Sequence, residues 1–243
     1  MNLEIYEEVL FNYLSSRLPI IFFFSLATLG MEWMRSRLYE GRFYQPFLLN
    51  LILAWVPLVL SVVADIIFWQ NGLHENWITL VLLGMWFAFF PNSIYLITEV
   101  HHFRDRFADH SREPFWFDNI EILSLVSVGL LIGSHSLVII HFLLRNHFSN
   151  SLSWITVISY VFLANFGIYI GRYWRFNSWD IFRRPFSLFK QIFRELSSCS
   201  QAKVLIIYII LFSFFILMFY LFVHLTIINL YTLTNQLEQL RTL

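Results

Sequence analysis

Charged residues are scarce in this chain, and cysteine is almost absent. Of its 243 residues only 13% are Asp, Glu, Lys or Arg, whereas about a quarter of the residues in a typical soluble domain are charged. The formal net charge is zero, so no excess of basic residues favours nucleic acid as a partner. The single Cys199 excludes an intramolecular disulfide. Composition therefore argues against an ordinary soluble domain and against a nucleic-acid-binding protein.

Two further absences narrow the class. No basic stretch precedes the first apolar run and no small-residue cleavage site follows it, so we expect a retained first span rather than a removable signal peptide. No internal repeat is visible, and the apolar runs lack the matching breaks that mark inverted-repeat transporters. A transporter of that kind is therefore disfavoured.

Apolar residues dominate what is present. They make up 58% of the chain, the mean hydropathy is +0.64, and Trp residues gather near the ends of apolar runs, as rings do at the bilayer interface. We predict an all-α, polytopic transmembrane bundle that forms one domain over residues 1–243. Six apolar runs are long enough to cross about 30 Å of hydrocarbon. They cover residues at about 18–34, 47–69, 77–98, 119–144, 152–174 and 204–228.

Two amphipathic segments are predicted to lie on the membrane surface. Residues 1–17 form the first, whose apolar face consists of Leu3, Tyr6, Leu10, Tyr13 and Leu14. Residues 185–196 form the second, whose apolar face consists of Phe186, Phe189, Phe193 and Leu196. Lys190 and Arg194 lie off that face and could draw this interfacial helix to anionic lipid, although a simple membrane anchor is the plainer explanation.

The distribution of basic residues predicts the orientation. Of the 16 Lys and Arg residues, 13 fall in one set of loops and 3 in the other. Because cytoplasmic loops carry the excess of Lys and Arg, both termini should lie outside and the two long polar loops in the cytoplasm. The predicted location is the cell membrane, which the chain crosses several times.

A polar stripe marks the end of the fifth run. Asn165, Tyr169 and Arg172 recur at helical spacing, so a helix places them on one face. Arg175 adds a second cation, and the segment from Asn177 to Asp180 has the composition of a turn with a fixed carboxylate. Two guanidinium groups at the end of a span could hold an anion.

A second stripe closes the third run, where Pro91 predicts a kink. Asn92, Tyr95, Glu99 and His102 recur at helical spacing toward the cytoplasmic face. Glu99 stands one turn before His102, so its carboxylate could orient the ring for acid or base chemistry. A buried, hydrogen-bonded packing pair explains the same pattern equally well.

Metal and haem are alternatives that the residues leave open. The loop from His101 to Asp118 holds enough nitrogen and oxygen for a divalent metal, but it contains no recognised zinc spacing. A solvated loop of mixed charge explains most of it. His135, His141 and His224 lie in the outer halves of their spans, where a bis-histidine haem would need them, although ordinary hydrogen bonding is the simpler explanation.

Two motifs support a family resemblance. The segments from Phe90 to His102 and from Gly171 to Asp180 resemble the signatures of a bacterial family of polytopic membrane proteins of unknown function. This chain has Glu99 where the family usually has Asp. The resemblance implies a bacterial inner membrane and supplies no reaction.

The resulting hypothesis is a polar site at the cytoplasmic ends of spans three to five, acting on a lipid or a lipid-linked phosphate. The predicted catalytic residues are Glu99, His102, Asp118 and Asp180, the last two orienting the base or binding a metal. The predicted substrate-binding residues are Asn92, Tyr95, Tyr169, Arg172, Arg175 and Asn177. The alternative is a non-enzymatic membrane partner, an assembly protein or a small transporter, in which these groups form a structural lock.

Overall fold

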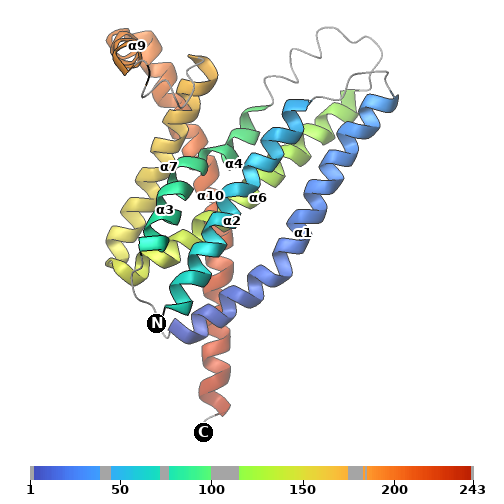
Figure 1. Ribbon diagram of the computed structural model, residues 1–243, viewed down its shortest axis with the longest axis vertical. Helices are drawn as coiled ribbons and strands as arrows, with labels where there is room; N and C mark the ends of the chain where they lie inside the picture. Colours follow the sequence, from blue (N-terminus) through green and yellow to red (C-terminus); the bar gives the residue numbers. More distant parts are fainter. Residues whose placement is uncertain are drawn as a thin grey trace. The chain divides into compact units, whose positions relative to one another are not determined.

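The computed structural model describes the chain except for residues 1–2, 39–44, 72–76, 100–114, 175–182, 184 and 242–243. All secondary structure in the described residues is helical, as the sequence predicts. The elements are α1 (Leu3–Leu38), α2 (Gln45–Gln70), α3 (Trp77–Phe89), α4 (Pro91–Tyr95), η1 (Leu96–Glu99), α6 (Phe115–His147), α7 (Asn150–Tyr173), α9 (Pro185–Ser197) and α10 (Cys199–Arg241) (Figure 1).

Six stretches of helix are long and apolar enough to cross a bilayer. They correspond one to one with the six predicted runs and indicate a multi-pass membrane protein. In the most apolar stretch of α6, 72% of the residues are buried, against at most 39% in the other five. α6 is therefore the most buried of the six spans, and many large apolar side chains on the other spans face outward, as contact with lipid requires.

The prediction that residues 1–17 form a separate surface helix is wrong. α1 runs without a break from Leu3 to Leu38, although it bends (Figure 1), and Pro19 inside it favours such a bend. The apolar face of the N-terminal part packs inside the protein. Tyr6 stacks on Phe142 of α6, with ring centroids 4.5 Å apart, and Tyr13 stacks on His135 at 5.6 Å.

The chain divides into two compact units, and each is described by itself. Unit 1 comprises Met1–Leu143 and Phe219–Leu243, and unit 2 comprises Leu144–Met218. In unit 1, polar side chains tie the helices together. Trp86 Nε1 of α3 donates to Ser136 Oγ of α6 at 2.6 Å, and Trp55 Nε1 of α2 donates to Ser25 Oγ of α1 at 3.2 Å.

Gly129 brings α4 against α6. A Cβ at this position would stand 2.7 Å from the backbone oxygen of Ser93 and 2.9 Å from the Cβ of Leu96, so only glycine allows this approach. One turn along α6, a Cβ at Gly133 would stand 3.3 Å from Ser93 Oγ. Gly129 and Gly133 have the spacing of a GxxxG motif, and together they set the position of the short segment that carries Glu99.

In unit 2, α7 packs on the first part of α10. Asn165 Nδ2 donates to Ser213 Oγ at 3.1 Å, and Tyr169 packs with Leu205 and Tyr208. The helix predicted after Pro185 is confirmed as α9. It buries Leu188 and Glu195, and the predicted apolar face points outward, with exposed fractions of 53–88% for Phe186, Phe189, Phe193 and Leu196.

Candidate functional site

Glu99 ends the irregular third span. α3 stops at Phe89, because the ring of Pro91 cannot continue the hydrogen-bond ladder of the preceding turn. Pro91 then begins α4, and the chain tightens into the 3₁₀ turn of η1, which ends at Glu99. Asn92 and Tyr95 in α4 are half-buried, whereas Glu99 is only 2% exposed.

This change from α to 3₁₀ geometry breaks the regular polar stripe that the sequence predicts at the end of the third span. An uninterrupted α-helix advances about 100° per residue, and a 3₁₀ helix about 120°, so Tyr95 and Glu99 are not on one regular α-helical face. Thr98 Oγ1 donates to the carbonyl of Tyr95 at 2.7 Å, which stabilises the tighter turn. Glu99 is instead fixed from α2, where Asn50 Nδ2 donates to its Oε1 at 2.9 Å. The sequence reasoning missed Asn50, which lies far from Glu99 in the chain.

A cluster of buried charges joins α1 to α6. Arg35 Nε donates to Asp118 Oδ1 at 3.2 Å and lies 3.8 Å from Glu121 Oε2, and Arg35 Nη1 lies 3.5 Å from Glu32 Oε2. All four side chains are at most 7% exposed. We call Glu32, Arg35, Asp118 and Glu121 the Arg35 cluster.

The Arg35 cluster gives Asp118 a partner that the sequence did not predict. α6 begins at Phe115, so Asp118 lies in its first turn. Its carboxylate binds Arg35 of α1. Glu32, Arg35 and Glu121 were not among the predicted site residues. The sequence feature that could have identified them is a pair of ionisable residues three positions apart in each of two apolar helices, Glu32 with Arg35 and Asp118 with Glu121.

The end of α2 that carries Asn50, the end of η1, the end of α1 and the start of α6 lie together at one end of unit 1 (Figure 1). Glu99 and the Arg35 cluster therefore gather at the same end of these helices. One turn farther along α1 and α6, the hydroxyls of Thr28 and Ser124 form a hydrogen bond. Buried ionisable groups in membrane helices commonly mark a functional site, because they are costly to retain.

The fifth-span stripe lies in unit 2. Tyr169 is 7% exposed and stands in an aromatic group with Tyr208 and Trp174, at ring-centroid distances of 5.2 and 5.7 Å. Arg172 lies in the last turn of α7 and is half-buried. The remaining predicted site residues lie outside the described residues: His102, Arg175, Asn177 and Asp180.

The predicted histidine group is partly brought together. His141 Nδ1 hydrogen-bonds the hydroxyl of Tyr220, and the rings of His141 and His224 stack with centroids 5.2 Å apart. Stacked imidazoles present faces to each other, whereas two haem ligands must aim ring nitrogens at one iron. His135 is held separately, with Nδ1 at 2.7 Å from the carbonyl of Leu131.

In the described part of the chain, no three His, Cys, Asp or Glu residues are arranged to hold a metal ion.

Residues 49–233 match a family model described as "Protein of unknown function (DUF1361)". The chain belongs to this family. No curated protein and no solved structure matches it. The matched DUF1361 region contains all ten predicted site residues, together with Asn50 and Glu121, whereas Glu32 and Arg35 precede it.

Proposed function

We propose that this DUF1361 protein has a polar site at the cytoplasmic ends of its spans, where it acts on a lipid or a lipid-linked phosphate. The observation that carries the proposal is the setting of Glu99. Its carboxylate is buried, held by Asn50 and carried on a short segment that α6 fixes in place. A carboxylate held in one orientation in a membrane helix is suited to acid or base catalysis or to orienting such a group.

In this proposal Glu99 orients His102, which transfers a proton to or from the substrate. Arg172 and Arg175 hold the phosphate group of the substrate through paired, charge-assisted hydrogen bonds. Asp118 and Asp180 orient the base or bind a divalent metal, and Arg35 positions Asp118. Asn92, Tyr95, Tyr169 and Asn177 contribute to substrate binding. These roles need Glu99 and Arg172 to serve one site, and the sequence supports this because spans three and five are predicted to run in the same direction across the membrane.

The experiment compares the lipids of cells that lack the protein with those of cells that express it. An enzyme predicts an accumulated precursor in the deletion strain. Wild-type protein should restore the normal lipids, and the Glu99→Gln and Arg172→Lys variants should not, because each keeps size and loses charge or the planar guanidinium. The Glu238→Gln variant, which changes an exposed residue of α10, is the matched control and should restore them.

One observation favours the non-enzymatic alternative. The Arg35 cluster ties α1 to α6 through buried ion pairs, and such pairs also serve as structural locks that fix one arrangement of helices. A membrane partner or assembly protein would use Glu99 and Asn50 in the same way. An unchanged lipid composition, together with the loss of a protein complex in the deletion strain, would favour this function over the enzyme.

A further inference from the structure

A cavity between α1 and α2 lies away from the proposed site. Its volume is about 330 Å³, which is within the range of small-ligand sites, about 300–1,000 Å³. Asp65 lines it near the end of α2, whereas Asn50, which holds Glu99, lies near the start of α2. At about 1.5 Å of rise per residue, the two are separated by about 22 Å of helix. The cavity and the Glu99 site are therefore at opposite ends of the same helix.

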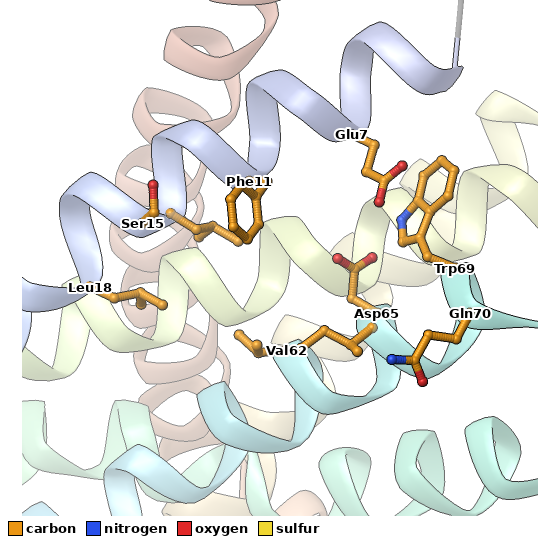
Figure 2. Close-up of a pocket in the computed structure, with 10 residues that line it drawn as sticks. Glu7, Phe11, Ser15, Leu18, Val62, Asp65, Trp69 and Gln70 are labelled. Carbon is orange, nitrogen blue, oxygen red and sulfur yellow. The ribbon is translucent and has the colours of Figure 1, made fainter.

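One end of the cavity is acidic. Glu7 from α1 and Asp65 from α2 direct their carboxylates into it, beside the indole ring of Trp69 (Figure 2). Asp65 Oδ1 is buried and accepts no hydrogen bond from the described residues. Two carboxylates of like charge repel each other, and a cation between them is attracted to both. The face of an indole ring also attracts cations.

The other end of the cavity is largely apolar, with Ser15 also lining it, and it is open to the surface. Phe11, Leu18 and Val62 line it (Figure 2), and the exposed fraction of Phe11 is 70%. Because α1 and α2 are both long and apolar enough to span a bilayer, this opening faces hydrocarbon when they do. A ligand that fits both ends has a cationic head and an apolar chain, and it can enter from the membrane.

We propose that this cavity binds a membrane lipid whose headgroup carries a primary ammonium. The ammonium lies between Glu7 and Asp65, beside Trp69, and the first part of one acyl chain lies along Phe11 and Val62. A primary ammonium donates hydrogen bonds to the carboxylates. A quaternary ammonium has no N–H to donate, and it usually binds in a cage of several aromatic rings, whereas Trp69 is the one aromatic residue among those that line the acidic end of this cavity.

The test uses the full chain in phosphatidylcholine nanodiscs that contain a trace of phosphatidylethanolamine with a photoreactive acyl chain. Mass spectrometry locates and quantifies the labelled residues. We expect labelling along α1 and α2 at the cavity, suppressed by unlabelled phosphatidylethanolamine and not by phosphatidylglycerol. Glu7→Gln and Asp65→Asn should each reduce labelling about tenfold, since each removes a charge-assisted hydrogen bond. Glu8→Gln, at the exposed neighbour of Glu7, should label like the wild type.

A second variant tests the lipid site by filling the cavity without changing a charge. Val62→Trp fills the apolar end of the cavity and should also abolish the label, even if Asp65→Asn does not fold. Equal labelling by phosphatidylcholine or phosphatidylglycerol probes, or labelling that Val62→Trp and Glu7→Gln leave unchanged, would mean ordinary lipid contact and overturn the proposal. Displacement of the label by dodecylammonium but not by phosphatidylethanolamine would assign the cavity to a free amine and equally overturn it.

Discussion

Arg35 carries a buried positive charge. Its guanidinium is buried, and carboxylates from its own helix and from α6 lie within 3.8 Å. A charge inside a membrane helix is costly unless it is paired, so Arg35 and its carboxylate partners stabilise one another. The consequences for stability should therefore exceed those of changing an exposed arginine on the same helix.

We predict that Arg35→Met destabilises the protein by about 3–5 kcal/mol, because it leaves buried carboxylates without their cation. The measurement is denaturant-induced unfolding of the purified protein in detergent. Arg37→Met is the control, since Arg37 is exposed and lies over the Trp33 ring at 5.7 Å, an interaction of about 0.5–1 kcal/mol. Equal losses for the two variants would contradict the assigned role of the Arg35 cluster.

Single residues also mark the limit of what the sequence predicts about the site. Glu99 and Asp118 stand out as acidic residues in or beside apolar runs, and both are buried with polar partners. Those partners could not be predicted, because helical periodicity relates residues a few positions apart. Asn50 and Arg35 reach their carboxylates across 49 and 83 positions of the chain.

At the scale of helices, the number and approximate extent of the spans follow from length and hydropathy alone. The position of residues 1–17 does not follow from these two properties. Their apolar face suits either a membrane surface or a protein surface, and only the tertiary packing of Tyr6 and Tyr13 decides between them. The switch from α to 3₁₀ geometry before Glu99 likewise depends on how α4 packs against α6.

Gly129 of α6 and Gly167 of α7 should respond differently to the same substitution. Gly129→Ala places a methyl group 2.7 Å from a backbone oxygen, so we expect a loss of about 1–3 kcal/mol from overpacking. A Cβ at Gly167 meets nothing within 4 Å, so Gly167→Ala should be neutral or stabilise by up to about 1 kcal/mol through helix propensity. Thermal unfolding in detergent distinguishes them. A stable Gly129→Ala variant would show that α4 does not depend on this contact.

At the scale of the whole molecule, the excess of Lys and Arg in alternate loops predicts the orientation. Cysteines introduced at Arg104 and Arg183 of a Cys199→Ser variant should resist an impermeant thiol reagent applied to intact cells, because both loops are expected in the cytoplasm. A cysteine at Asn71, in the loop end expected outside, is the control and should react. Labelling at positions 104 and 183 from outside would reverse the topology.

The proposed function rests on the sequence prediction that Glu99 and Arg172 serve one site. The most direct measurement is cross-linking of Glu99→Cys with Arg172→Cys by a short bifunctional thiol reagent, in the Cys199→Ser background. The pair Asn50→Cys and Glu99→Cys, whose native side chains are hydrogen-bonded, sets the rate for a true contact. Ser149→Cys at the opposite end of α7, paired with Glu99→Cys, sets the background. The account predicts that the 99–172 pair cross-links nearly as fast as the 50–99 pair. A 99–172 rate no higher than the 99–149 background, with the 50–99 pair intact, would contradict it.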